Sequence, residues 1–446
     1  MPEIFDYFLS NFALTNNTGR IPISYGLESD GLIRVNDSSA SIFASDSEIT
    51  VNSFVWKEWN GQSIPLLSAS TEFDIITEHF EGYIQINYDI VASAFFFLSG
   101  WNEKFGSNRD ALGRVTFAGS IIEKLGIREL PVVDYYYDIL RSALTKKGVV
   151  ALSKKWAGKS FAMTLTHDID TCKSAWIQGS VSEFKQGRLH NIPKLILSRF
   201  LGEDEWFNFR EISEIERLNN ARSTFFFLPR KGVIEGIKNA DYSIRSTEIQ
   251  TAIDQLYSEG HEIGVHGSYG SSIDGEKFTQ DIKALNRQAV CGNRFHFLMF
   301  DLFETVTVLE SSGIKYDASL GFADHIGFRR STCSPFYLFN FASNRTSHVI
   351  EIPLIVMDRT LQHRKYLNLK PSEAINFITP ILEEVKKNNG VLCILWHNIF
   401  FSAYKYGGWK SVYLKLLALG SNEGALLTNG SHIVDVITET SNIEER

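Results

Sequence analysis

The feature of this sequence that most limits its fold is a regular alternation of apolar runs with amphipathic helical patterns, which begins at Phe161. Nearly continuous apolar runs are typical of strands that are buried on both faces, and such strands separated by helices form a parallel α/β sheet. Periodicity alone does not tell whether the sheet closes into a barrel. We expect strands at 161–166, 223–229, 262–266, 350–357 and 391–397, and helices at 207–221, 248–259, 277–289, 299–311 and 372–389.

The first part of the chain, up to about residue 150, has a different pattern. Short runs at 50–57 and 82–91 alternate or are apolar like strands, and clusters of Asn, Gly, Ser and Asp between them indicate turns. A helix is expected over 132–144, where a proline precedes the pattern and a Lys-Lys-Gly run follows it. We therefore expect a smaller α+β domain over 1–150 and a larger domain over 151–446.

Composition and charge exclude several classes of protein. With 44 Lys and Arg against 52 Asp and Glu, the formal net charge is −8, and no basic block supplies the surface that nucleic acid requires. The four cysteines form no CxxC pair, which argues against a disulfide framework and a structural zinc site. The N-terminus lacks a secretory pattern, and the densest apolar run, at 90–98, is too short to cross a bilayer. We expect a cytoplasmic protein without a membrane span.

Polar side chains follow the predicted strands at their carboxyl ends, where parallel α/β folds place their active residues. Asp168 and Asp170 end the first strand, His266 ends the third and His397 ends the last. The two aspartates point to the same face, where their charges repel each other unless a cation lies between them or one holds a proton. Alone, the pair predicts either a divalent metal site or turn-capping aspartates; the histidines at the other strand ends favour the metal.

Three motifs in order resemble those of the polysaccharide deacetylases of carbohydrate esterase family four. They are Thr-x-Asp-x-Asp at 166–170, Gly-His-Glu-Ile-Gly-x-His at 260–266 and Leu-Trp-His-Asn at 395–398. The resemblance covers roughly residues 160–430 and implies a distorted (β/α)7 barrel that removes N-acyl groups from amino sugars with a divalent metal, usually Zn²⁺.

The same resemblance implies roles for single residues. By this likeness Asp168 is the general base, Asp170 and His266 are metal ligands, and His397 is the general acid. The spacing of Asp168 and Asp170, with one residue between them, departs from the adjacent pair that is commoner in the family and matches variants of it. Arg294 is expected to orient Asp168, as the arginine of the family does.

One departure from the family concerns the third metal ligand. The family usually supplies a second histidine four residues after the first, and Gly270 stands at that position. His296, in the run Asn-Arg-Phe-His-Phe at 293–297, is our candidate for the third ligand, with Ser271 or a water as the alternative. If none of these serves, the domain would be a degenerate carbohydrate binder.

Substrate contacts and the N-terminal domain are less constrained. Tyr269 and Trp396 lie beside the expected ligands and could pack on a sugar, although plain barrel packing suits Trp396 better. Arg329 could bind an anionic substituent, and a structural salt bridge is an equal alternative. The segments 92–101 and 134–140 resemble the companion domain of a bacterial subgroup of the family, which would shape the cleft or mediate dimerisation.

The expected function is therefore that of a metal-dependent hydrolase that removes an N-acyl group, acetyl first of all, from an amino sugar in a glycan or glycan precursor. The expected partners are this carbohydrate substrate and, through dimerisation, a second copy of the chain. One alternative is removal of a formyl group or opening of another amide on the same scaffold. A second alternative is a carbohydrate-binding protein without catalysis.

Overall fold

The computed structural model describes residues 2–18, 21–26, 30–45, 48–68, 73–105, 108–154, 156–200, 204–287 and 290–439. Its main feature is a ten-stranded sheet in the order β16-β17-β15-β14-β13-β10-β9-β19-β18, in which β20 also pairs with β9. All its pairs are parallel except β16 with β17. The strands are β9 (Ala162–Ile169), β10 (Thr224–Phe227), β13 (Glu262–Gly267), β14 (Gly292–Phe295), β15 (Tyr316–Asp317), β16 (Phe336–Asn340), β17 (Arg345–Glu351), β18 (Leu354–Met357), β19 (Val391–Leu395) and β20 (Leu426–Thr428).

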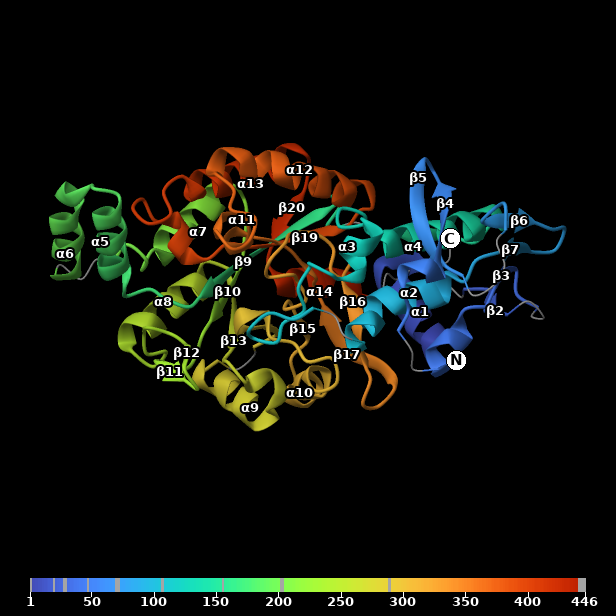
Figure 1. The fold of residues 1–446 in the computed structure, drawn as a ribbon, viewed down its shortest axis with the longest axis horizontal. Coiled ribbons are helices and arrows are strands. Elements are labelled where there is room, and N and C mark those ends of the chain that lie inside the picture. Colours follow the sequence, from blue (N-terminus) through green and yellow to red (C-terminus); the bar gives the residue numbers. More distant parts are fainter. Residues whose placement is uncertain are drawn as a thin grey trace.

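Helices cover the outside of this sheet, as Figure 1 shows. Every residue of β9, β10 and β19 is buried, which is the reason that these strands read as continuous apolar runs. The parallel α/β architecture expected from the alternation is confirmed. The covering helices are α7 (Phe209–Leu218), α8 (Thr247–Ser258), α9 (Gly275–Ala284), α10 (Thr305–Ser312), α11 (Asp358–Gln362), α12 (Pro371–Lys387), α13 (Trp409–Asn422) and α14 (Gly430–Thr438).

Two expected elements differ from those observed. The helix expected over 299–311 begins only at Thr305, because the Asp301 carboxylate accepts the backbone N–H groups of Phe303 and Glu304 in a turn. The strand expected over 350–357 is interrupted between β17 and β18 at Ile352 and Pro353. Proline has no N–H to donate to a ladder, so the pairing stops there.

This interrupted segment determines the shape of the sheet. Its first part, β17, pairs with β15, and its second part, β18, pairs with β19. Only two residues separate β17 from β18, although these strands lie near opposite ends of the strand order. The sheet must therefore curl to bring the two strands together. The structure therefore has a curled, mainly parallel sheet, whereas the (β/α)7 count that the resemblance implies stays a prediction.

The N-terminal region, residues 2–153, combines helices with small sheets. A four-stranded sheet has the order β2-β3-β7-β6, β4 pairs with β5, and β8 pairs with β1. Ser153 of β8 pairs with Asn16 of β1, so the chain keeps contact with its own beginning as far as residue 153. The elements are α1 (Pro2–Thr15), β1 (Asn16–Thr18), β2 (Ile23–Tyr25), β3 (Ile33–Val35), β4 (Phe54–Trp59), β5 (Gln62–Leu67), β6 (Thr77–His79), β7 (Ile84–Ile86), α2 (Ile90–Ser99), α3 (Ile121–Leu125), α4 (Val132–Lys146) and β8 (Ala151–Ser153).

The strand patterns expected in this region are only partly right. The run 82–91 forms a strand at Ile84–Ile86 and then a helix, α2, because the Asp89 side chain accepts the N–H of Ala92 and begins the helix. All ten residues of α2 are buried, and a fully buried helix has no polar face to distinguish it from a buried strand. The run 50–57 forms a strand from Phe54, and α4 confirms the helix expected over 132–144.

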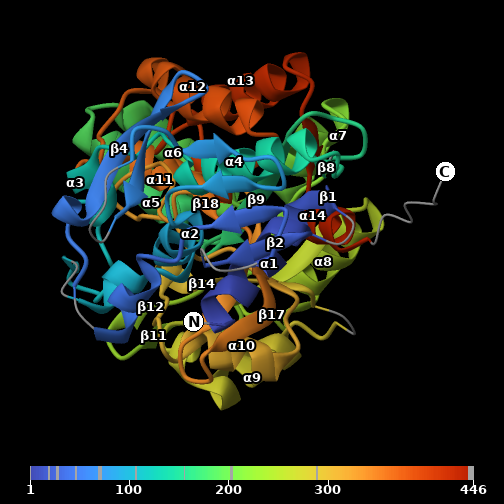
Figure 2. The ribbon, with the colours of Figure 1, turned by 90° about the vertical axis from the view of Figure 1, so that its right-hand side faces the viewer.

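A buried ionic cluster joins the N-terminal region to the sheet. Glu103 accepts hydrogen bonds from Arg329 (3.0 and 2.9 Å) and from Arg330 (3.3 Å). Gly100, at φ 75°, lies against the Arg330 guanidinium, and a Cβ there would lie 1.5 Å from it. Figure 2 views the molecule from this side, with α1 and α2 in front of the sheet. The region is therefore held to the loop before β16 by buried polar contacts.

A helical hairpin projects at the opposite end of the molecule, as Figure 1 shows. It consists of α5 (Ala175–Lys185) and α6 (Ile192–Phe200), between β9 and α7, and neither helix was among those expected from the sequence. A short β-ribbon, β11 (Val233–Ile234) with β12 (Ile237–Lys238), follows β10. Among the described residues, no helix is both long and apolar enough to cross a membrane.

Candidate metal and hydrolase site

Strands β14, β13, β9 and β19, with β10 between β13 and β9, bring the candidate site residues to one end of the sheet. Asp168 lies in β9 and His266 in β13, where His266 is paired with Arg294 of β14. His397 follows β19, which pairs with β9. Because parallel strands end at the same edge, residues more than 200 positions apart in the sequence meet there.

Three side chains could hold a metal ion. The ligand atoms of Asp170, His266 and His296 all lie within 4.8 Å of one another. Asp170 Oδ1 is 3.2 Å from His266 Nε2 and 3.9 Å from His296 Nε2. This oxygen is buried and accepts no well-aligned hydrogen bond from the described residues, which is costly unless a cation lies beside it. One carboxylate and two imidazoles are ligands that Zn²⁺ accepts, so the residues present fit the expected metal.

The surroundings lower the pKa of Asp170 and of His296, which favours their ligating forms, whereas the Asp168 and Asp170 carboxylates outweigh burial and raise the pKa of His266. The Nδ1–H of His266 donates to the carbonyl of Arg294 (2.6 Å), which leaves Nε2 to face Asp170. Burial lowers the pKa of His296 to about 4, so its ring is neutral at neutral pH. Burial alone would raise the pKa of Asp170, but the imidazoles of His296, His266 and His397 hold it well below its usual range.

The glycine at the position of the family's second histidine has a structural reason. Gly270 has φ 80°, in the left-handed region that side chains rarely adopt. A Cβ there would lie 2.9 Å from Nζ of Lys277. Ser271, the alternative ligand, donates its hydroxyl to the carbonyl of Ser268 (2.7 Å). His296 lies 5.2 Å from His266 between ring centroids and is the third member of the cluster.

Arg294 is fully buried and connects Asp168 to the interior of the sheet. Its Nη1 donates to Asp168 Oδ1 (3.0 Å) and to Thr166 Oγ1 (2.7 Å). Its Nε donates to the carbonyl of Ala318 (2.7 Å). The other oxygen of Asp168, Oδ2, is 3.6 Å from His266 Nε2. The guanidinium therefore fixes one carboxylate oxygen and leaves the other facing the metal cluster.

His397 belongs to a pair that sequence reasoning missed. Its Nδ1 donates to Asp358 Oδ1 (2.8 Å) and its backbone N–H donates to Oδ2 (2.5 Å). Its Nε2 faces Asp170 Oδ2 at 3.8 Å. Burial opposes protonation, but Asp358 outweighs burial and raises the pKa of His397 to about 9. The position of Asp358, directly after the strand expected over 350–357, was a signal that could have found it.

Residues next to these in sequence point the other way. His167, between Thr166 and Asp168, faces two acceptors behind the strand: Nδ1 lies 2.6 Å from the carbonyl of Trp396 and Nε2 lies 2.8 Å from the Glu216 carboxylate. His261 lies 2.9 Å from the Ser213 hydroxyl, in agreement with a structural role for this histidine. The alternation of side chains along a strand thus separates site residues from packing residues.

The three expected substrate contacts lie in different surroundings. Tyr269 follows β13 and is partly buried. Trp396 is fully buried and packs against Trp409 and Tyr413, which favours the packing alternative. The guanidinium of Arg329 is occupied by Glu103 and the carbonyl of Gly321, which favours the salt-bridge alternative over binding of an anion.

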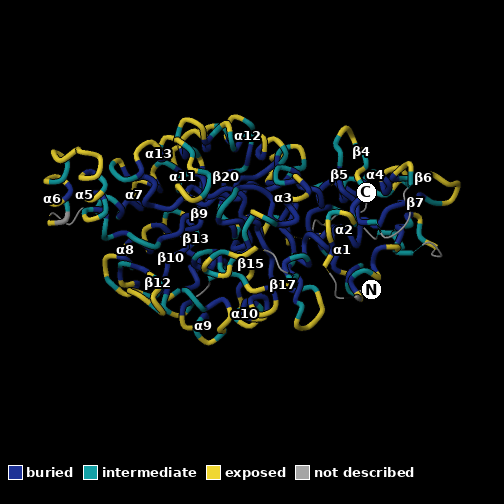
Figure 3. Tube along the Cα trace, viewed as in Figure 1, coloured by how far each residue is buried: buried dark blue, intermediate teal, exposed yellow. Residues whose placement is uncertain are grey.

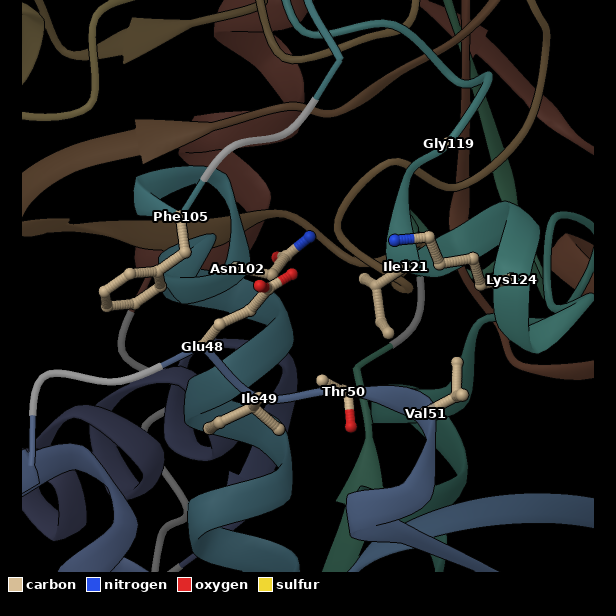
Figure 4. Close-up of a pocket in the computed structure, with 9 residues that line it drawn as sticks. All are labelled: Glu48, Ile49, Thr50, Val51, Asn102, Phe105, Gly119, Ile121 and Lys124. Carbon is tan, nitrogen blue, oxygen red and sulfur yellow. The ribbon is translucent and has the colours of Figure 1, made fainter.

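Two cavities lie elsewhere in the described part of the molecule. One of about 140 Å³ lies in the N-terminal region, where segments 48–51, 102–105 and 119–124 converge, as Figure 4 shows. A hollow of about 820 Å³ lies near Glu262 at the amino end of β13, away from the site. Among the described residues, the cluster of Asp170, His266 and His296 is the group of metal-ligating side chains that could hold an ion.

Comparison with known proteins gives likenesses of two kinds. Residues 4–149 match the profile of a family of unknown function, DUF7033. No curated protein matches the chain. A structure from Mycobacterium smegmatis, described as a polysaccharide deacetylase, is 16% identical, with a TM-score of 0.42, and the match covers 63% of this chain and 91% of that one.

Two further structures have the same TM-score of 0.42. The PuuE allantoinase is 11% identical, and the match covers 64% of this chain and 93% of that one. A protein from Pseudomonas aeruginosa PAO1, described as a polysaccharide deacetylase, is 10% identical, and the match covers 63% of this chain and 92% of that one. The function proposed below therefore rests on the site residues themselves.

Proposed function

We propose that this chain is a metal-dependent hydrolase that removes an N-acyl group, acetyl first of all, from an amino sugar. The observation that carries the proposal is the meeting of Asp168, the Asp170–His266–His296 cluster and the His397–Asp358 pair at one end of a parallel sheet. An amide hydrolase needs a base for water, an electrophile for the carbonyl and an acid for the leaving amine, and these three groups can supply them.

Asp170, His266 and His296 would hold the metal. When bound, the metal would polarise the acyl carbonyl and lower the pKa of a water beside it. Asp168 would take a proton from this water through Oδ2, since Arg294 occupies Oδ1. His266, locked by the carbonyl of Arg294, would keep Nε2 directed at the cluster while Arg294 orients the base.

His397 would act at the leaving group. The oxygen of water bonds to the acyl carbon, the C–N bond then breaks, and the sugar nitrogen takes a proton from Nε2 of His397. Asp358 supports this role because it raises the pKa of His397 to about 9, so the ring carries a proton at neutral pH. The products are a carboxylate and an amine. Asp168 would then release the proton that it took from water, either to solvent or to His397.

The test combines metal analysis with an assay of acyl release. Metal content and acetate release from N-acetylated chito-oligosaccharides are measured for the wild type, Asp168→Asn, Asp170→Asn and His296→Ala, with the exposed His348→Ala as the matched control. Asp168→Asn should retain metal and lose turnover, whereas Asp170→Asn and His296→Ala should lose metal. Equal metal content in all five proteins would contradict the roles. Formylated substrates in the same assay distinguish a deformylase.

A second function is favoured by one observation, the glycine at position 270 in place of a ligand histidine. A degenerate site would bind carbohydrate without hydrolysing it. Absence of metal from the wild type, even after it is soaked with Zn²⁺, together with binding of the same oligosaccharides, would favour this alternative.

A further inference from the structure

The hairpin of α5 and α6, residues 175–200, is built unlike the other helices of the molecule. It stands apart from the body in Figures 1 and 3. Between its two helices Leu195 is buried and packs against Gly179, where a Cβ would lie 3.2 Å from Leu195 Cδ1. Glu183, also buried, accepts hydrogen bonds from Arg188 and Asn191. The inner face of the hairpin is therefore small and partly polar.

The outer face of the hairpin is apolar. Seven of the nineteen exposed large apolar side chains in the described part of the chain lie within these 26 residues. Phe200 is 82% exposed and Phe184 is 68% exposed. In a soluble protein such a surface normally covers a core or binds a partner. The seven side chains are Ile177, Val181, Phe184, Leu189, Ile196, Leu197 and Phe200.

Five of these side chains form one stripe on each helix. On α5 they recur at intervals of four and three residues, and on α6 Ile196 and Phe200 are four residues apart. Residues at this spacing lie on one side of a helix. The helices have 11 and 9 residues, too few to cross a bilayer but enough to lie in its surface.

The net charge of the hairpin indicates the chemistry of its partner. Four basic residues and one acidic residue give the segment 175–200 a net charge of +3, in a chain of net charge −8. Lys185 and Lys194 are exposed beside the apolar side chains, whereas Arg188 is paired with the buried Glu183. Basic side chains beside apolar ones are typical of helices that bind anionic lipid surfaces. Two copies of this hairpin would repel each other, which argues against self-association through it.

The hairpin begins at the rim of the site. α5 starts five residues after Asp170. Asn398, next to His397, donates from Nδ2 to the carbonyls of Thr171 (2.9 Å) and Trp206 (2.7 Å), one on each side of the hairpin. The two ends of the hairpin are therefore tied to the loop that carries His397.

We propose that the hairpin of residues 175–200 binds the surface of an anionic lipid bilayer and holds the site beside it. A substrate reached in this position is an N-acylated amino sugar joined to a lipid. The identity of this substrate rests on the proposed function, whereas binding of the hairpin to the bilayer does not.

The first experiment measures binding of the full-length chain to vesicles by flotation. Vesicles of equimolar phosphatidylglycerol and phosphatidylcholine should bind the protein, vesicles of phosphatidylcholine alone should bind it less, and added salt should weaken binding. Phe184→Ser with Phe200→Ser should weaken binding at least about tenfold, because two phenyl groups no longer enter the lipid. Lys185→Glu with Lys194→Glu should remove the preference for anionic vesicles.

The matched control is Leu218→Ser with Phe303→Ser, a pair of exposed apolar residues outside the hairpin, which should bind as the wild type does. Failure of the wild type to bind anionic vesicles, or unchanged binding of the Phe184/Phe200 variant, would overturn the proposal. A dimer in light scattering that this variant dissociates would also overturn it.

A second measurement separates the two proposals. Asp168→Asn should bind vesicles as the wild type does, because its defect lies in catalysis. Vesicle binding without acyl release from either lipid-linked or water-soluble amino sugars would refute the proposed function and leave the docking intact. Acyl release from water-soluble sugars without vesicle binding would refute the docking alone.

Discussion

Replacement of Glu103 by Gln should destabilise the protein by breaking the buried ionic cluster with Arg329 and Arg330. Burial alone would raise the pKa of Glu103, but these two guanidiniums lower it from 4.5 to about 2. At 1.36 kcal/mol per pH unit this difference corresponds to about 3 kcal/mol of stability. Removal of one partner from a buried ion pair typically costs about 3–5 kcal/mol, since the other charges stay buried without compensation. We therefore expect Glu103→Gln to lose about 3 kcal/mol.

Urea unfolding at neutral pH measures this loss, and the exposed Glu81→Gln serves as the matched control. The sign of the pH effect follows from the depressed pKa: the contribution of Glu103 is complete above its ordinary value of 4.5 and is lost as the pH falls toward about 2. The difference between the wild type and Glu103→Gln should shrink over that range. A difference below about 1 kcal/mol at neutral pH would refute the reasoning.

Four further outcomes are expected. Arg294→Lys should lower turnover at least about tenfold with metal retained, because an ammonium cannot reproduce the hydrogen bonds of the planar guanidinium to Thr166 and Asp168; unchanged turnover would contradict this. Gly264→Ala should lower the unfolding free energy by about 1–3 kcal/mol, since its Cβ would lie 2.4 Å from the Phe226 ring; an unchanged melting temperature would contradict this. Adding Gly270→His to His296→Ala should not restore metal binding, because position 270 has φ 80°; recovered metal would show that the loop adapts. A chelator should abolish acyl release and Zn²⁺ should restore it, whereas activity that survives dialysis against the chelator would exclude the metal.

Much of the site could be predicted because the apolar runs show where each strand ends, and the carboxyl ends of parallel strands lie at the same edge of the sheet. Asp168, His266 and His397 follow apolar runs, and no knowledge of distant contacts is needed to bring such residues to one edge. His296 required an additional step, since its place in the cluster depends on the turn after β14. Asp358 was missed because its partner His397 lies 39 residues away and its own position looks like an ordinary helix start.

The parts that could not be predicted depend on contacts between distant segments. The sequence left Arg329 open between binding of an anion and a salt bridge, because its partner Glu103 lies 226 residues earlier. The run at 90–98 is apolar on every side, so neither helical nor strand periodicity is visible in it. The hairpin at 175–200 was not expected, although its apolar residues recur at helical spacing, and the sequence does not show that they are exposed rather than buried.

The position of Arg294 has a consequence for how related chains could be recombined. Its guanidinium reaches Thr166 and Asp168 of β9, the carbonyl of Ala318 after β15, and Cys393 of β19 at 3.6 Å. A chimera whose crossover falls between residues 294 and 393 would join the arginine of one parent to the β19 acceptor of the other. Such a hybrid keeps Asp168 aligned only when both parents carry matching groups at these places, so crossovers before residue 160 preserve the whole set in one fragment.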